Sequence, residues 1–203
     1  MLYESFGFPI ELIQEELKKN NIPFDINGFE QCKLDHIKQS QTLSAGKFKS
    51  GLADNSEIIT KYHTATHLLH TALRQVLGDH VQQSGSNITA ERLRFDFSHD
   101  EKLTEDQIKK VTDIVNQQIK DKLIITKEII PFTEAQKQGA IAFFGNKYPD
   151  VVSVYTVGSD ENCYSKEVCT GPHVANTDEL GTFEIIKEES AGSGRRRIYA
   201  ILK

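Results

Sequence analysis

The sequence has few cysteines, no excess of positive charge and no long apolar run, and each shortage excludes a class of protein. The three cysteines, Cys32, Cys163 and Cys169, are an odd and sparse set. They argue against a disulfide framework and leave Cys169 available to bind a metal ion. No apolar run approaches the roughly 20 residues of a membrane span, and the N-terminus lacks a signal-peptide pattern. We therefore expect a cytoplasmic protein with no membrane partner. The net charge of −5 excludes a generally basic surface, so a nucleic-acid partner would have to be held at local patches.

The length allows one sizeable core and a small appended unit, since the chain has 203 residues, of which 38% are hydrophobic. Residues 1–43 predict a helical segment with two helices, one ending before Pro23 and one starting after Asp25. Residues 44–57 are rich in Gly, Ser, Lys and Asp, a composition typical of a linker. Residues 58–203 then form the main domain.

The main domain alternates between strand-like and helical patterns. Thr104 is the predicted N-cap of one helix, and the polar residues 82–87 predict a turn. Strands joined by short turns, with helices laid against them, predict an α+β domain: an antiparallel sheet packed with helices, preceded by the small helical unit. The predicted strands cover 92–97, 123–130, 151–157, 183–187 and 198–202, and the predicted helices cover 62–78, 104–119 and 133–138.

The helix predicted from Tyr62 to Gly78 has two different stripes. Leucines and alanines recur at the i, i+3, i+4 spacing that buries one face. His63, His67 and His70 fall on a stripe almost opposite the first, so we expect them to point away from the packed side. Two histidines on adjacent helical turns are close enough to share one cation, and zinc prefers imidazole nitrogen. The helix therefore offers half of a metal site.

The other half is predicted in the run from Cys169 to His173. Three intervening residues let a thiolate and an imidazole meet at one metal if the segment turns back, and Gly171 with Pro172 favours such a turn. Together the two motifs predict a Zn²⁺ site with three imidazoles and one thiolate. Its ligands would be His63, His67, Cys169 and His173.

Two questions about this site stay open on spacing alone. Four candidate ligands fit either a closed structural site or a catalytic site that keeps one position open. His70, one turn beyond His67, could replace a ligand or face a substrate. A metalloprotease is excluded, because Thr64 stands where the HExxH motif requires its glutamate base.

Six motifs follow one another along the chain: HTATHLLHTALRQVLG at 63–78, QSGS at 83–86, RLRFDFSH at 92–99, GAIAFFGNKY at 139–148, the CxxxH loop at 169–173 and GRRRI at 194–198. In this order they resemble the editing domain of alanyl-tRNA synthetases and of free-standing alanyl-tRNA editing proteins. The segment LYESFGFPIELI, residues 2–13, is also similar to the end of the synthetase's tRNA-recognition region, so the resemblance covers nearly the whole chain.

The resemblance implies hydrolysis of the ester bond of tRNA(Ala) mischarged with serine or glycine. It places zinc on the four ligands above and Gln83 beside the misplaced amino acid. A pocket for alanine can hardly exclude glycine and excludes an added hydroxyl only by about a hundredfold, so a second, hydrolytic site supplies the missing discrimination. The implied partners are the acceptor end of tRNA(Ala) and the rest of the synthetase, which carries the ATP-dependent ligase site. This chain lacks the class II catalytic motifs.

The only basic cluster, Arg195, Arg196 and Arg197, is predicted to hold phosphates of the tRNA, although ion pairs with Glu188 and Glu189 would explain these arginines equally well. In full-length alanyl-tRNA synthetases a β-barrel subdomain usually precedes the HTATH motif, and we expect this subdomain to be missing or vestigial here.

Two alternatives to editing of tRNA(Ala) follow from the same residues. The family's usual loop is CGGTH, whereas residues 169–173 read CTGPH. This form is closer to the related editing domain of threonyl-tRNA synthetase, so editing of Ser-tRNA(Thr) is one alternative. The other is a noncatalytic tRNA-binding module in which the zinc is structural.

Overall fold

The chain divides into two compact units, Met1–Phe48 and Lys49–Lys203. The computed structural model describes residues 10–20, 22–26, 28–31, 56–142, 148–159, 161–192 and 194–203. In the first unit, helix α2 (Ile10–Lys19) confirms the first predicted helix. Residues 26 and 28–31 are also helical. The rest of the predicted second helix, and the predicted linker up to residue 55, lie outside the described residues.

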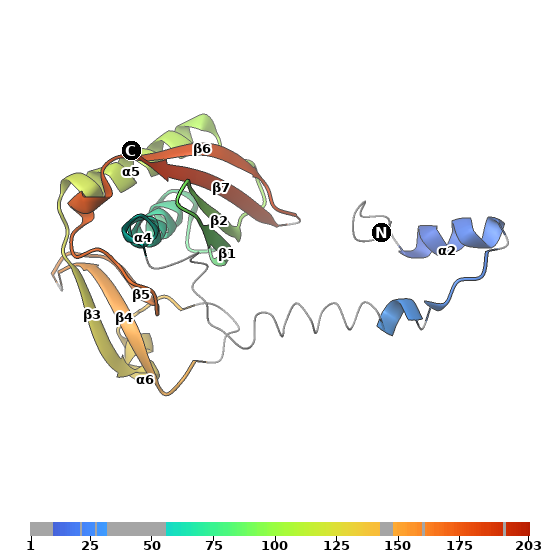
Figure 1. Ribbon diagram of the computed structural model, residues 1–203, viewed down its shortest axis with the longest axis horizontal. Coiled ribbons are helices and arrows are strands. Elements are labelled where there is room, and N and C mark those ends of the chain that lie inside the picture. The colour runs from blue at the N-terminus through green and yellow to red at the C-terminus, as the bar shows by residue number, and fades with distance from the viewer. Residues whose placement is uncertain are drawn as a thin grey trace. The chain divides into compact units, whose positions relative to one another are not determined.

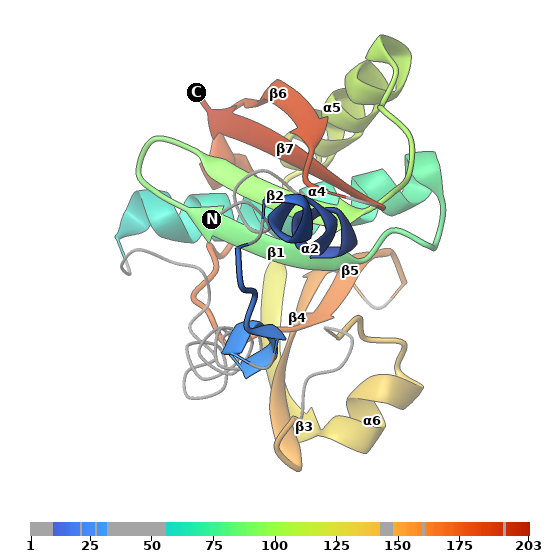
Figure 2. The same cartoon turned by 90° about the vertical axis from the view of Figure 1, so that its right-hand side faces the viewer.

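The second unit is built on a four-stranded antiparallel sheet in the order β1-β2-β7-β6. Helices α4 (Glu57–Leu77) and α5 (Glu105–Lys120) cover one face of this sheet, and its other face is turned toward the viewer in Figure 2. Alternate residues of β2 and β7, including Phe95, Phe97 and Ile198, pack under the helices in the main core. The strands are β1 (Gln83–Ile88), β2 (Leu93–Ser98), β6 (Phe183–Ser190) and β7 (Arg195–Leu202).

A three-stranded antiparallel sheet in the order β3-β4-β5 forms the other part of this unit (Figure 1). Helix α6 (Phe132–Lys137) packs on it through a small apolar cluster that contains Ala135, Val152 and Val154. The strands are β3 (Ile125–Pro131), β4 (Val151–Gly158) and β5 (Cys163–Val168), and a 3-10 helix, η1 (Thr177–Leu180), follows β5. The α+β class with antiparallel sheets packed against helices is thereby confirmed.

The start of α5 follows the predicted capping chemistry. The Thr104 hydroxyl accepts a hydrogen bond from the backbone N–H of Gln107 at 3.2 Å, and the Gln107 side chain accepts from the backbone N–H of Thr104 at 2.8 Å. This reciprocal pair satisfies two backbone donors that the first helical turn leaves without partners. Thr104 is therefore the N-cap, as the sequence predicts.

Two expectations about local structure are wrong, and one strand was not predicted. Residues 82–87 form no polar turn, because Gln83–Ile88 pair with β2 as an edge strand. Strand β5 was not predicted, since its buried residues Ser165 and Glu167 are polar. The histidine stripe of α4 is buried rather than outside the packed part of the domain.

The helices within the described residues lack the combined length and apolarity of a membrane span.

We predict that Leu73→Ala lowers the free energy of unfolding by about 2–5 kcal/mol, because the side chain is fully buried in the main core and its removal leaves a cavity. Urea denaturation of the 203-residue chain measures this change. Gln75→Ala, on the exposed side of the same helix, is the matched control and should leave the urea midpoint almost unchanged. Equal midpoints for the two variants would contradict the core assignment.

Candidate metal centre

Helix α4 and the loop after β5 bring four side chains together. His63 and His67 lie on successive turns of α4, and Cys169 and His173 lie about a hundred residues later in the chain. One potential ligand atom from each of the four lies within 4.8 Å of the corresponding atoms of the other three. Cys169 Sγ lies 3.3 Å from His63 Nε2. The four residues singled out by spacing thus form one cluster, which we call the His/Cys cluster.

The loop reaches α4 because Gly171 has no side chain. A Cβ atom on Gly171 would lie 2.0 Å from Cε1 of His63, far inside van der Waals contact. The next residue orients the same ring: the Pro172 carbonyl oxygen lies 3.2 Å from His63 Nδ1. A hydrogen bond there requires the proton on Nδ1, and the lone pair of Nε2 then faces Cys169.

Thr64 orients His173 in a similar way. Its hydroxyl donates to the Thr60 carbonyl at 3.1 Å and accepts from the backbone N–H of Val174 at 3.2 Å. Since the hydroxyl hydrogen is already used, the His173 Nδ1 atom at 3.3 Å must be the donor to Thr64. The lone pair of His173 then lies on Nε2, a buried atom without a hydrogen-bond partner among the described residues. Thr64, which stands where an HExxH protease has its glutamate, thus fixes the tautomer of His173.

Glu167 connects the cluster with His70. One carboxylate oxygen lies 3.2 Å from His70 Nδ1 and accepts from the Ser165 hydroxyl at 3.3 Å, and the other lies 3.9 Å from His67 Nδ1. Burial alone would raise the pKa of this carboxyl, but the two histidines and the Ser165 hydrogen bond lower it to about 2. An ionised carboxylate behind a ligand histidine is a common support in zinc sites.

Burial sets the protonation of the cluster. It lowers the pKa of His63 to about 3 and also lowers the pKa values of His67 and His173, with neighbouring histidines adding to the effect. Burial raises the pKa of the Cys169 thiol to about 12. At neutral pH the three imidazoles are therefore neutral and have lone pairs to donate, whereas the thiol loses its proton only when a metal binds.

This donor set fits zinc. Three imidazole nitrogens and one thiolate complete a tetrahedral site, and zinc accepts both kinds of ligand. The unpartnered Nε2 atom of His173 has the environment that a metal ligand needs, since a buried polar atom without a partner is otherwise costly. Among the described residues, the His/Cys cluster is the group of histidine, cysteine and acidic side chains that can hold a metal ion.

A cavity of about 270 Å³ lies beside the cluster and contains Gln83. Gln83 stands at the start of β1, and His70 and Glu167 line the same cavity from α4 and β5. None of the four cluster residues lines it. Glu167 therefore provides the connection, because it faces the cavity and also lies 3.9 Å from His67. The remaining lining residues are Arg74, Gln82, Gly139, Ala140, Ile141, Ala142 and Val168.

The three arginines of the predicted basic cluster have different environments. Arg196 Nε donates to Glu188 at 2.5 Å, and both side chains are largely buried. Arg197 makes two hydrogen bonds to Asp96, at 2.7 and 2.9 Å. Arg195 is exposed. The ion-pair reading thus describes Arg196 and Arg197, with Asp96 in place of Glu189 for the second arginine.

Sequence reasoning missed Glu167 and the role of Thr64. Glu167 stands near the end of β5, two residues before Cys169, which follows directly after this strand. That spacing was a usable signal, but recognising it required the prediction of β5. For Thr64 the signal was its position inside HTATH, one residue after a ligand.

Comparisons with known proteins agree with this geometry. Residues 152–199 match the family described as the threonyl and alanyl tRNA synthetase second additional domain. The chain is 55% identical over 201 residues to an alanine–tRNA ligase of Borreliella afzelii, covering 99% of this chain and 33% of the relative. It is 54% identical over 202 residues to that of Treponema denticola, covering 100% and 33%, and 43% identical over 173 residues to that of Bacillus velezensis, covering 82% and 19%.

The chain spans about a third of the length of the Borreliella and Treponema relatives at 54–55% identity. The shared second additional domain lies within this part and includes β4, β5 and the loop with Cys169 and His173. The chain is homologous to the C-terminal part of alanyl-tRNA synthetases, which contains this domain.

Proposed function

We propose that this chain hydrolyses the ester bond of Ser-tRNA(Ala) and Gly-tRNA(Ala), as the editing part of an alanyl-tRNA synthetase. One observation carries the proposal: a His/Cys cluster with the donor set of zinc lies next to a cavity that holds Gln83. The similarity to alanine–tRNA ligases supports tRNA(Ala) as the substrate. A pocket that binds alanine cannot exclude serine and glycine well enough, so this tRNA becomes mischarged with them.

The residues divide the work as follows. When bound, a zinc ion supplies a Lewis acid that polarises an ester carbonyl and lowers the pKa of bound water. Gln83 has an amide that both donates and accepts hydrogen bonds, so it can bind the serine hydroxyl in the cavity. His70 and Glu167 add polar groups to the same cavity, His70 from α4, which also carries His63 and His67, and Glu167 from β5, which ends just before Cys169.

Glu167 acts as a positioning residue in this proposal. Its ionised carboxylate fixes the proton of His70 on Nδ1, at 3.2 Å, and faces Nδ1 of His67 at 3.9 Å. Both rings are more than nine-tenths buried, with 3% of His70 and 5% of His67 exposed. The hydrogen bond to Glu167 fixes the tautomer of His70, so the lone pair of this ring is held on Nε2 before a substrate arrives.

The second candidate, a noncatalytic tRNA-binding module with structural zinc, is favoured by one observation. The four cluster residues make a complete ligand set, and none of them lines the cavity that contains Gln83. A closed tetrahedral site would leave no position for water or substrate. Editing would instead require a metal position open to the substrate, so hydrolysis of the ester distinguishes the two candidates.

We predict that Cys169→Ala slows deacylation of Ser-tRNA(Ala) more than about a hundredfold. Loss of a metal ligand should cost more than the 10–100-fold typical of losing a supporting residue. Release of labelled serine from precharged tRNA measures the rate. Cys163→Ala is the matched control, because Cys163 is an exposed free cysteine, and it should keep the parent rate.

Two results would decide between the candidates. A parent chain that releases no serine, with zinc bound, would refute editing and support the noncatalytic module. Ser-tRNA(Thr) tested in parallel separates the threonyl-type alternative, because faster release from Ser-tRNA(Thr) than from Ser-tRNA(Ala) would reassign the substrate.

We predict that zinc binding at pH 7 releases about one proton per metal ion. The lowered pKa values leave the histidines already neutral, whereas the Cys169 thiol, with its pKa raised to about 12, must lose its proton to become a ligand. Calorimetric titration in buffers of different ionisation enthalpy counts the protons. Cys169→Ala should release almost none. Release approaching four protons would show that the histidines are charged before the metal binds.

We predict that Gly171→Ala weakens zinc binding by about 10–100-fold, since the added methyl group would overlap the His63 ring and displace this ligand. Competition with a chromophoric chelator measures the affinity. Thr170→Ala is the control in the same loop, because Thr170 is exposed, and it should bind zinc as the parent does. Equal affinities for the two variants would argue against a metal held by His63.

A further inference from the structure

The face of the four-stranded sheet that α4 and α5 leave uncovered carries a group of cationic side chains around one tyrosine. We propose that this face binds the phosphate backbone of the tRNA whose aminoacyl end enters the cavity. We call it the outer-sheet patch, and only the identity of the RNA rests on the proposed function. It consists of Arg92, Arg94, Lys187, Arg195, Arg197 and Tyr199.

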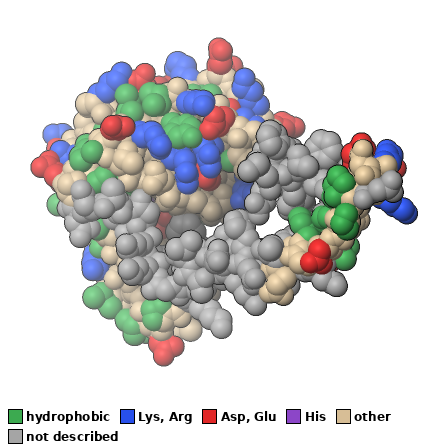
Figure 3. Space-filling view, turned by 45° about the vertical axis from the view of Figure 1, so that its right-hand side comes forward, with side chains coloured by type: hydrophobic (Ala, Val, Ile, Leu, Met, Phe, Trp, Pro, Cys, Tyr) green, Lys and Arg blue, Asp and Glu red, His purple; other side chains and the backbone are tan. Residues whose placement is uncertain are grey.

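Strand register brings these residues together. Arg94 is paired with Tyr199 across β2 and β7, and Tyr199 is paired with Lys187 across β7 and β6. Arg195 and Arg197 follow at alternate positions of β7, so their side chains share this face. Figure 3 shows Lys and Arg side chains gathered here, with fewer acidic ones between them.

Tyr199 organises the patch. The guanidinium carbon of Arg92 lies 4.8 Å from the centre of its ring, and the Lys187 ammonium lies 5.6 Å from it. The Tyr199 hydroxyl bonds Glu189 at 3.2 Å, which fixes the ring. Cations held over an aromatic ring lose less conformational freedom when they bind an anion.

The cations of the patch outnumber its carboxylates. Five cationic side chains share the surface with Asp96 and Glu189, an excess of three positive charges on a chain whose net charge is −5. Arg197 is paired with Asp96, and Lys187 with Glu189 at 2.5 Å. At the far end of β6 and β7, Glu184 pairs with Lys203 and leaves this excess unchanged.

Two guanidinium groups in the patch have donors that nothing satisfies. Arg92 Nη1 and Arg94 Nε are buried atoms without a hydrogen-bond partner among the described residues. The nearest carboxylate oxygen to Arg94 Nε, on Asp96, is 3.6 Å away, beyond hydrogen-bond distance. Because these two atoms are buried, an external anion would instead contact the exposed part of each guanidinium group, and the Arg94 side chain is 30% exposed. Phosphate is the anion that a planar guanidinium matches best.

Position favours RNA over an isolated anion. The cations extend over three adjacent strands, so they can contact successive phosphates of one chain. Strand β1 connects the patch with the cavity: Gly85 lies opposite Asp96 in the patch, and Gln83, at the start of the same strand, lines the cavity. An RNA strand held on this face would therefore end close to Gln83.

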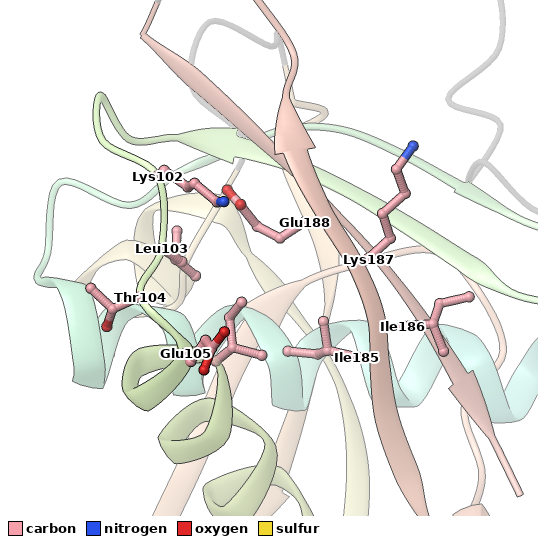
Figure 4. Close-up of a pocket in the computed structure, with 9 residues that line it drawn as sticks. Lys102, Leu103, Thr104, Glu105, Ile185, Ile186, Lys187 and Glu188 are labelled. Carbon is pink, nitrogen blue, oxygen red and sulfur yellow. The ribbon is translucent and has the colours of Figure 1, made fainter.

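Arg196 does not belong to the patch. It projects to the other face of β7, where it pairs with the buried Glu188. Glu188 borders a second cavity of about 540 Å³ between α5 and β6, and Figure 4 shows its side chain directed toward Lys102. Adjacent residues of β6 and β7 thus point to opposite faces of the sheet, and the outer-sheet patch lies on the face that α4 and α5 leave uncovered.

The test compares binding of an uncharged tRNA(Ala) transcript by the 203-residue chain and by the triple variant R92Q/R94Q/R195Q. These substitutions leave the Arg197–Asp96 and Lys187–Glu189 ion pairs in place and remove only the longer contact of 3.6 Å between Arg94 and Asp96. The variant should bind about tenfold more weakly or worse at 50 mM salt. Its plot of log affinity against log salt should be less steep by up to about three, one for each lost phosphate contact. Fluorescence anisotropy measures both quantities.

Three exposed lysines outside the patch provide the matched control, K110Q/K120Q/K137Q on α5 and α6. The control has the same net charge as the triple variant and should keep most of the parent affinity and slope. Thermal unfolding within about two degrees of the parent confirms that both variants fold. Cys169→Ala should keep the parent slope, so loss of hydrolysis and loss of RNA binding are separable.

Three results would overturn the proposal: no binding of the transcript by the parent at 50 mM salt, equal slopes for the parent and the triple variant, or an equal loss in the lysine control. Polyglutamate that displaces the transcript as effectively as unlabelled tRNA would assign the patch to an acidic peptide and overturn it as well. If the slope falls as expected but the parent releases no serine, the RNA surface stands and the editing proposal fails.

Discussion

The contact between α4 and the end of β5 is the constraint on which the site depends. A helix and a strand with the loop that follows it, about a hundred residues apart in sequence, meet through polar side chains rather than through a purely apolar seam. Thr64, Glu167 and Pro172 each use a hydrogen-bonding atom to fix one imidazole. These hydrogen bonds offset part of the cost of burying polar groups, and ligand atoms of the four cluster residues converge where a cation would sit.

The same burial decides the chemistry of the site. An exposed histidine is half protonated near pH 6.5, and an exposed thiol keeps its proton up to about pH 8.5. Here burial lowers the pKa of each cluster histidine and raises that of the Cys169 thiol. The imidazoles are therefore ready to donate, and the charge of a metal ion is needed to ionise the thiol. Glu167 supplies a fixed negative charge beside them.

The two faces of the four-stranded sheet separate folding from recognition. Its covered face carries Phe95, Phe97 and Ile198 against α4 and α5, so it holds the domain together. The residues between these on β2 and β7 point to the open face, and most of them are charged rather than apolar. A chain with net negative charge can in this way keep a cationic surface in one place, which its overall composition conceals.

Periodicity and capping were enough to predict most helices and strands, because their signals are local: Thr104 with Gln107 starts α5, and alternation in 92–97 marks β2. The pairing of HxxxH with CxxxH came from ligand chemistry, which spacing expresses directly. Strand β5 and the burial of the histidine stripe escaped prediction, since polar residues are buried only when another element satisfies them. Partners such as Glu167 for His70, or Asp96 for Arg197, are distant in sequence and are chosen by strand register and helix packing. Residue types therefore defined which ligands were available, and the packing of α4 on β5 decided how they were oriented, protonated and joined to a cavity.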